Sequence, residues 1–199
     1  MSVANYLTLI RVFIGPLFLA FYMGAEWMGI PPVVVPYILL FLLLVTELSD
    51  LFDGYVARRL NQVTNLGKIL DPMADSIVRI SVFLSFTQGI VHLPLLLVFV
   101  FLYRDSVVGT LRTVCGLRGF ALAARPSGKI KAVVQGSTAF IITLLMIPES
   151  LGYISRETLQ WSAIWLVAVA GAYTLFSGVD YIIANGHHIA KLLTEKKEA

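Results

Sequence analysis

The stretch from Ser49 to Ile80, SDLFDGYVARRLNQVTNLGKILDPMADSIVRI, decides the interpretation of this chain, because it sets acidic side chains into strongly apolar surroundings. Four aspartates follow the apolar run VVVPYILLFLLLV: Asp50, Asp53, Asp71 and Asp75. An ionised aspartate in hydrocarbon costs at least about 2.5 kcal/mol. A chain that keeps four carboxylates beside such a run needs something to compensate their charge.

The composition of the whole chain is that of an integral membrane protein. Of the 199 residues, 58% are hydrophobic and only 14% are charged, whereas about a quarter of the residues in a soluble domain are charged. At about 20 residues per span the chain has room for six helices. Its one cysteine, Cys115, excludes an internal disulfide bond and is interpreted as a small apolar filler.

The apolar runs predict an all-α fold with six transmembrane helices and a polar active site that faces the cytoplasm. We expect one domain over residues 1–199, with a short cytoplasmic tail at about 186–199. The predicted spans are Tyr6–Met23, Val33–Leu51, Ile69–Ile90, Leu93–Val114, Val133–Ile147 and Trp161–Ala184.

Lysine and arginine residues gather in alternate connections, which predicts the orientation. The second and fourth connections and the tail are basic, and they contain Arg58, Arg59, Lys68, Arg118, Arg125, Lys129, Lys131, Lys191, Lys196 and Lys197. By the positive-inside rule both termini lie in the cytoplasm. The net charge of +3 then reflects topology and contact with anionic lipids, so nucleic acid is not an expected partner.

The spacing of the acids predicts that they converge. If the second span continues as a helix, Asp50, Asp53, Gly54 and Ala57 share one face. On the third span Asp71 and Asp75 are four residues apart and also share a face. The connection between these spans is short, so we expect the two helices to be antiparallel neighbours.

Two explanations of the carboxylate cluster remain open. Oxygen ligands without a Cys/His cluster favour hard divalent cations such as Mg²⁺ or Mn²⁺. Alternatively the acids are solvated helix ends or pair with Arg58, Arg59 and Arg79. The glycines Gly54 and Gly67, each within one turn of an acid, leave space for a ligand or for another backbone.

The complete pattern D-x2-D-G-x2-A-R-x8-G-x3-D-x3-D, from Asp50 to Asp75, resembles the signature of the CDP-alcohol phosphotransferase family. The segment NYLTLIR, with Asn5, Thr8 and Arg11, resembles that family's amino-terminal segment. The stretches LDPMAD and RPSGKIKAVVQ resemble its phosphatidylglycerophosphate synthase branch. The resemblance extends to about Ala184 and to the six-helix plan.

The resemblance implies an enzyme that transfers a phosphatidyl group from CDP-diacylglycerol to glycerol 3-phosphate, with release of CMP. It implies two divalent ions, Mg²⁺ or Mn²⁺, a homodimer surrounded by membrane lipids, and a bacterial inner membrane. By matched position the metal ligands are Asp50, Asp53, Asp71 and Asp75, of which Asp75 is also the general base. The residues matched to CDP binding are Asp50, Gly54, Ala57, Arg58, Thr64 and Gly67.

The acceptor phosphate needs cations besides the metals. The candidates are Arg104, Arg112, Lys129, Lys131 and Arg79, although interfacial snorkelling explains any one of the basic residues equally well. Asp105 shares a helix face with Arg112, and we expect it to orient that arginine. Asp180, near the inner end of the sixth span, is expected to pair with a basic residue.

Two departures from the branch concern the acceptor. Ser76 stands where the branch has lysine, and Ala132 stands where it has threonine. Arg79 either supplies the missing charge to the acceptor phosphate or pairs with Asp75.

Two other functions compete with the favoured one. A sister enzyme with another alcohol acceptor, such as inositol phosphate, would keep the same catalytic motif. An ion or proton transporter would also place acids inside a membrane, but it does not explain the motif spacing or Arg58. Motifs for nucleotide binding through a P-loop or a dinucleotide fingerprint are absent from the sequence.

Overall fold

The computed structural model describes residues 11–59, 67–117 and 125–187, with side chains described outside 50–59 and 67–71. These parts of the chain form six helices: α2 (Ile14–Gly24), α3 (Val35–Arg59), α4 (Gly67–Ser85), α5 (Leu95–Leu117), α6 (Pro126–Ser150) and α7 (Arg156–Ala184). Each predicted apolar segment overlaps one helix, although the first begins in residues outside the described ranges and the third, predicted to Ile90, runs past the end of α4 at Ser85. The all-α prediction is confirmed for the described chain.

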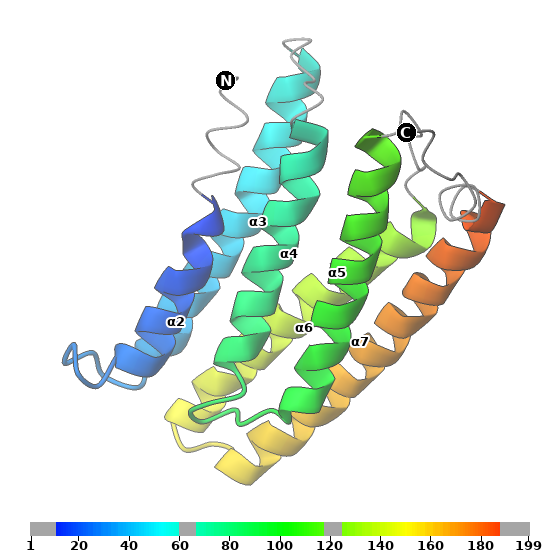
Figure 1. The fold of residues 1–199 in the computed structure, drawn as a ribbon. Helices are drawn as coiled ribbons and strands as arrows, with labels where there is room; N and C mark the ends of the chain where they lie inside the picture. Colours follow the sequence, from blue (N-terminus) through cyan, green and yellow to red (C-terminus); the bar gives the residue numbers. More distant parts are fainter. Residues whose placement is uncertain (1–10, 60–66, 118–124, 188–199) are drawn as a thin grey trace.

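Consecutive helices run antiparallel in one bundle (Figure 1). α4 packs against α2, α5 and α6, while α3 packs against α2 and α6 and α7 packs against α5 and α6. α3 and α4 are antiparallel as predicted, but over their described residues they contact α2 and α6 instead of each other.

Two of the helices, α6 and α7, are long and apolar enough to cross a membrane, and shorter apolar helices cover Ile14–Gly24 and Val35–Ser49. Large apolar side chains also cover the outside of the bundle. On α7 the residues Trp165, Val169, Phe176 and Ile183 are each at least 60% exposed. An apolar exterior of this extent is typical of a protein whose solvent is lipid.

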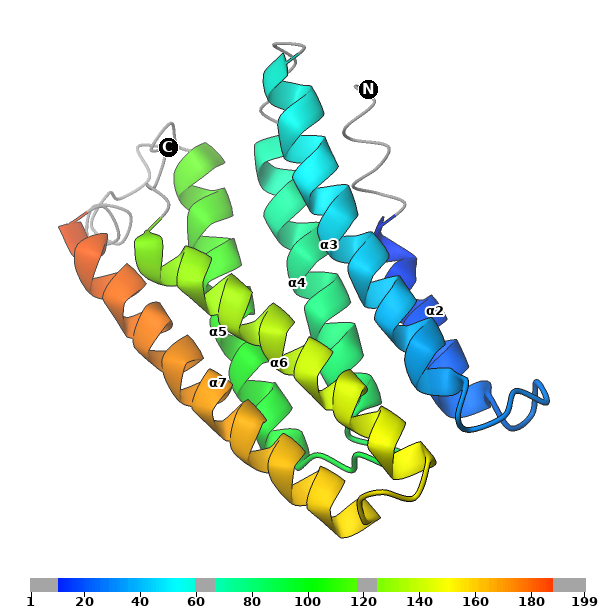
Figure 2. The ribbon, with the colours of Figure 1, turned by 180° about the vertical axis from the view of Figure 1, so that it is seen from behind.

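The bundle has two different ends, as Figures 1 and 2 show. At the end that we name the motif end, α3, α5 and α7 finish and α4 and α6 begin. At the opposite end, the Tyr22 hydroxyl donates to the carbonyl of Gln88 at 2.8 Å and accepts from the amide of Val91 at 3.1 Å. The Gln160 side chain donates to the carbonyl of Ile90 at 3.0 Å. These bonds tie the loop between α4 and α5 to α2 and α7.

An aromatic cluster fills the core toward the opposite end. The Phe18 ring meets Phe86 edge to face at 5.7 Å between centroids, and the Phe83 and Phe101 centroids are 4.7 Å apart. All four side chains are almost completely buried. Rings in these arrangements stabilise a core beyond their buried area.

α2 and α4 approach closely at Gly15. A Cβ atom at Gly15 would lie 2.8 Å from the Ser81 Oγ atom and 2.9 Å from its Cβ. A Cβ at this crossing would force the Ser81 side chain or the two helices to shift, because real Cβ atoms essentially never come so close to another atom. Arg11 precedes Gly15 by one helical turn, so the crossing brings Arg11 toward the part of α4 that carries Asp75.

Candidate active site

The motif acids lie on the helices that the sequence predicted. Asp50 and Asp53 belong to the last part of α3, and Asp71 and Asp75 belong to the first part of α4. Helical spacing therefore places each pair at positions that share a face. The side chains of Asp50, Asp53 and Asp71 lie outside the described residues, and so do those of Gly54, Ala57, Arg58 and Gly67; Thr64 lies outside altogether.

Asp75 is the motif acid whose side chain the structure describes, and it is paired with Arg11. The Arg11 guanidinium donates to the Asp75 carboxylate at 2.7 Å. The Arg11 side chain is 0% exposed, whereas the Asp75 side chain is 23% exposed. Arg11 thus holds the carboxylate from the buried side and leaves part of it accessible.

Arg11 was not among the predicted site residues. The available signal was an arginine inside an apolar amino-terminal segment, since a buried guanidinium requires a carboxylate partner. Spacing along the chain could not identify that partner, because Arg11 and Asp75 are 64 residues apart.

A small pocket of about 10 Å³, enough for about one water molecule, borders Asp75 and is lined by Thr46, Glu47, Asp75 and Arg79. It lies between α3, which carries the first two residues, and α4, which carries the other two. The described ion pairs include none between Asp75 and Arg79, so the structure does not support the alternative that Arg79 pairs with Asp75. The sequence interpretation did not consider Glu47.

A second carboxylate, Asp105 on α5, lies in a closed network. The Lys131 ammonium of α6 donates to its two oxygens at 2.7 and 2.8 Å. Arg104 donates to it at 3.0 Å and the Ser76 hydroxyl at 3.3 Å. The Asp105 side chain is 2% exposed. These bonds join α4, α5 and α6 through one buried anion.

The expectation that Asp105 orients Arg112 is wrong. Asp105 is occupied by Lys131, Arg104 and Ser76. The Arg112 guanidinium instead lies over the Tyr181 ring, 5.7 Å from its centroid. Arg112 shares a helix face with Asp105 but does not pair with it, because Arg104 of α5 and Lys131 of α6 already occupy the carboxylate.

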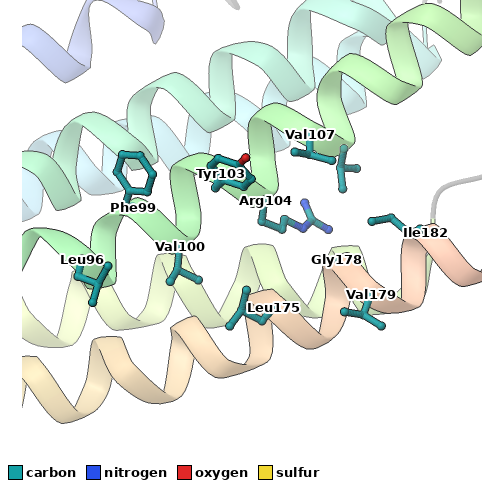
Figure 3. A pocket seen from close by; sticks show the side chains of 11 residues that line it. Leu96, Phe99, Val100, Tyr103, Arg104, Val107, Leu175, Gly178, Val179 and Ile182 are labelled. Atoms are coloured by element: carbon teal, nitrogen blue, oxygen red, sulfur yellow. The ribbon is translucent and has the colours of Figure 1, made fainter.

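Arg104 also crosses from α5 to α7. Its guanidinium donates to the Ser177 hydroxyl at 2.8 Å, and a Cβ atom at Gly178 would lie 3.1 Å from the Arg104 Cγ. Figure 3 shows Arg104 between these helices, in an otherwise apolar groove that faces outward. Arg104 therefore links α5 to α7 through Ser177 while it also bonds to Asp105.

Of the predicted acceptor cations, Arg104, Lys131 and Arg79 lie close enough together for their charges to interact. Lys131 and Arg104 bind Asp105, Arg112 lies over Tyr181, and Lys129 is exposed near the start of α6. Arg79 lines the same pocket as Asp75. Of the five candidates, Arg79 is thus the one that the structure places next to the predicted base.

The prediction that Asp180 pairs with a basic residue is confirmed. Arg125 donates to its carboxylate at 2.7 and 3.2 Å, and the Ser127 hydroxyl also donates to it. The hydrogen bonds that Arg125 donates to Asp180 raise the pKa of Arg125 above its usual value. Arg125 remains positively charged, and the contact joins the start of α6 to the end of α7.

The chemistry of the donor set fits a divalent metal. Carboxylate oxygens are the ligands that Mg²⁺ and Mn²⁺ prefer. The four motif aspartates belong to the parts of α3 and α4 at the motif end. Among the side chains that the structure describes, no three potential metal ligands lie together. A metal centre would therefore include Asp50, Asp53 and Asp71 besides Asp75.

Sequence comparison relates the chain to one group of known enzymes. Residues 1–175 match the family described as CDP-alcohol phosphatidyltransferase. A protein from Bacillus subtilis (strain 168), named CDP-diacylglycerol--glycerol-3-phosphate 3-phosphatidyltransferase, is 29% identical over 85% of this chain and 91% of its own length. Proteins with the same name from Rickettsia felis and Sodalis glossinidius are 30% and 27% identical, over 88% and 95% of this chain and 93% and 97% of their own lengths.

Proposed function

The chain belongs to the CDP-alcohol phosphatidyltransferase family, and on this premise we propose that it transfers the phosphatidyl group of CDP-diacylglycerol to glycerol 3-phosphate. The products are phosphatidylglycerophosphate and CMP. The observation that carries the choice of acceptor is the shared name of relatives that match 85% or more of the chain. The partly exposed Asp75 supports the chemistry, since the attacking alcohol has to lose a proton.

In this mechanism Asp75 accepts the proton of the attacking hydroxyl group. Arg11 keeps the carboxylate in place through the hydrogen bond between them. The hydroxyl oxygen forms a bond to the lipid-linked phosphorus, and the bond from that phosphorus to the CMP oxygen breaks. Binding both substrates in one site would hold the hydroxyl oxygen in line with the phosphorus that it attacks.

The acids of α3 and α4 complete the donor site. Asp50, Asp53, Asp71 and Asp75 would hold two divalent ions, Mg²⁺ or Mn²⁺, and these would neutralise charge on the diphosphate. The CDP group would lie against the face of α3 and the start of α4, with contacts from Asp50, Gly54, Ala57, Arg58, Thr64 and Gly67.

The candidate cations for the acceptor phosphate fall into two groups, those that are paired with a carboxylate in the described structure and those that are not. Lys131 and Arg104 would have to leave Asp105 before binding it directly. Arg79, Lys129 and Arg112 have no carboxylate partner among the described ion pairs. We assign phosphate binding first to these three and give Lys131 and Arg104 the role of holding the helices around the site.

The apolar exterior and the family support a membrane arrangement with six spans. Both termini and the motif end would face the cytoplasm, since basic residues concentrate at that end. The diacylglycerol tails of the substrate would remain in the lipid. A homodimer in a bacterial inner membrane is the assembly that the family resemblance implies.

The test is release of CMP by purified protein in detergent with CDP-diacylglycerol and Mg²⁺. Glycerol 3-phosphate, inositol phosphate, serine and no acceptor are compared, and the lipid products are identified by mass spectrometry. We expect turnover with glycerol 3-phosphate alone, and its loss after EDTA treatment or in Asp71→Asn. Turnover with a different alcohol would overturn the acceptor. Cation flux in liposomes without CMP release would favour the transporter instead.

A further inference from the structure

The groove between α5 and α7 is a hollow in the apolar exterior of the bundle, with a volume of about 410 Å³ (Figure 3). Apart from Arg104 and Tyr103, the side chains that line it are apolar. They include Leu96, Val100, Val108, Leu175, Val179 and Ile182. Arg104 already bonds to Asp105 and Ser177. Water in this groove would find few polar partners, so an apolar occupant is expected.

The length and direction of the groove match one acyl chain in one leaflet of a membrane. Leu96 and Val108 line its two ends on α5, and their separation along the helix is about 18 Å at 1.5 Å per residue. One leaflet of a bilayer is about half of the 30 Å hydrocarbon core. Both α5 and α7 finish at the motif end, so the groove runs in the direction in which lipid chains lie.

Two hydrogen-bond donors without a partner lie where the groove reaches the motif end. Val108 lines the groove and also packs on Tyr181, and the Arg112 guanidinium lies over the Tyr181 ring. The Arg112 Nε atom and the Tyr181 hydroxyl are buried, and neither forms a hydrogen bond within the described parts of the chain. A buried polar group without a partner is costly. A cationic donor beside a hydroxyl group suits an anion.

We propose that the groove between α5 and α7 binds an anionic phospholipid, with one acyl chain in the groove and its phosphate group at Arg112 and Tyr181. The anion contact lies toward the motif end and the apolar groove extends from it into the bundle, which is the order of headgroup and chain in that leaflet. The inference goes beyond the proposed function, because this lipid is bound and not consumed. Of the three cations assigned first to the acceptor phosphate, Arg79 and Lys129 then remain for the acceptor.

The position of the groove separates its lipid from the substrate. The diphosphate of CDP-diacylglycerol is assigned to the acids of α3 and α4. Over their described residues α3 contacts neither α5 nor α7, and the groove faces outward between the latter two helices. A lipid in this groove therefore occupies a second place on the protein.

The two donors also favour a phospholipid over a second copy of the chain. An apolar helix of another copy would fill the groove but would bring no acceptor to Arg112 and Tyr181. A phospholipid supplies both parts, since its chain is apolar and its phosphate oxygens accept hydrogen bonds. A guanidinium is well suited to such oxygens because its donors form a planar fork.

The experiment measures lipid binding directly, by native mass spectrometry of the purified protein in detergent. Palmitoyl-oleoyl phosphatidylglycerol and palmitoyl-oleoyl phosphatidylcholine are titrated separately; they have the same chains and differ in headgroup charge. Val179→Trp fills the groove, and Val169→Trp is its matched control, because Val169 is exposed on the same helix and does not line the groove. Arg112→Gln removes the cation, with Arg156→Gln at the opposite end as control.

We expect wild type to bind the anionic lipid about 5-fold more tightly than the zwitterionic one. Val179→Trp should weaken binding of both lipids by at least about 10-fold, because the chain loses its apolar contacts, whereas Val169→Trp should bind like wild type. Arg112→Gln should bring the preference close to one, and Arg156→Gln should keep it. Thermal unfolding in detergent establishes that each variant is folded.

Three results would overturn the proposal. The first is equal lipid binding by folded Val179→Trp and Val169→Trp; if Val179→Trp does not fold, Leu175→Trp replaces it, since Leu175 is also exposed and lines the groove. The second is unchanged lipid binding in a Val179→Trp variant that has changed its oligomeric state, which would make a second copy the occupant. The third is a raised KM for glycerol 3-phosphate in Arg112→Gln with unchanged lipid preference, which would return Arg112 to the acceptor.

Discussion

Asp75 and Asp105 are two carboxylates on adjacent helices, both bound by cations, yet they differ in what they leave accessible. Asp75 is 23% exposed and is held by Arg11 at 2.7 Å. Asp105 is 2% exposed and receives Lys131 through two oxygens as well as Arg104. The first carboxylate is partly accessible, whereas the second is enclosed by the helices that it joins. Accessibility, more than the presence of a counter-charge, separates a reactive acid from a structural one.

Ser76 connects these two regions. It follows Asp75 in the chain and donates to Asp105 at 3.3 Å. A lysine at this position would bring a third cation to a carboxylate that Lys131 and Arg104 already occupy. The serine is thus compatible with the Asp105 network, and Arg79 supplies a positive charge one turn away.

The largest expected effect comes from Asp75→Asn, which tests the reactive side of the comparison. Loss of the proton acceptor should lower kcat by about 10²- to 10⁴-fold. The amide keeps the size of the side chain, so binding of CDP-diacylglycerol should persist. CMP release and equilibrium binding in detergent measure the two effects. Unchanged turnover would remove Asp75 from the mechanism.

Asp105→Asn tests the structural side. It leaves the charges of Lys131 and Arg104 without their anion in a buried place, and removing one partner of a buried pair costs about 3–5 kcal/mol. We expect a lower free energy of unfolding, measured by denaturant titration in mixed micelles. The matched control is Asp180→Asn, whose pair with Arg125 is more exposed and should matter less. A fully stable but inactive Asp105→Asn variant would contradict the division of roles.

Replacement of Arg11 tests whether Asp75 depends on its partner. Arg11→Met should lower kcat by about 10-fold or more, because a misplaced base transfers protons poorly. Arg11→Lys retains the charge and should restore part of the activity, while KM for glycerol 3-phosphate should change little in both variants. Equal activity of the methionine and lysine variants would show that charge next to Asp75 is unimportant.

The smallest expected effect concerns the packing that brings Arg11 to Asp75. Gly15→Ala places a Cβ atom 2.8 Å from the Ser81 Oγ and should destabilise the protein by about 1–3 kcal/mol. Gly15→Ala with Ser81→Ala removes part of the conflict and should recover part of the loss.

Gly109→Ala is the matched control, because within the described structure no side chain beyond its chain neighbours and no other helix lies within 4 Å of the added Cβ. It should unfold at the wild-type temperature or slightly above it, since alanine favours a helix over glycine. Equal stability of Gly15→Ala and wild type would show that α2 and α4 adjust freely.

The sequence by itself determined the helical class, the apolar segments that became helices, and the positions of the motif acids along α3 and α4. These properties follow from local periodicity and hydrophobicity, which act over one or two turns. Asp71 and Asp75 are both in helix α4, as their spacing predicted. The basic partner expected for Asp180 is Arg125.

Only the tertiary structure decided which charges meet. Arg11 reaches Asp75 through a helix crossing at Gly15, and Glu47 of α3 lines a pocket together with Arg79 of α4. Asp105 forms its ion pair with Lys131 of α6, whereas Arg112, which is on the same helix as Asp105, lies over Tyr181. Pairing of charges depends on distances across helices, and a pattern along one helix contains no information about the helix that will pack against it.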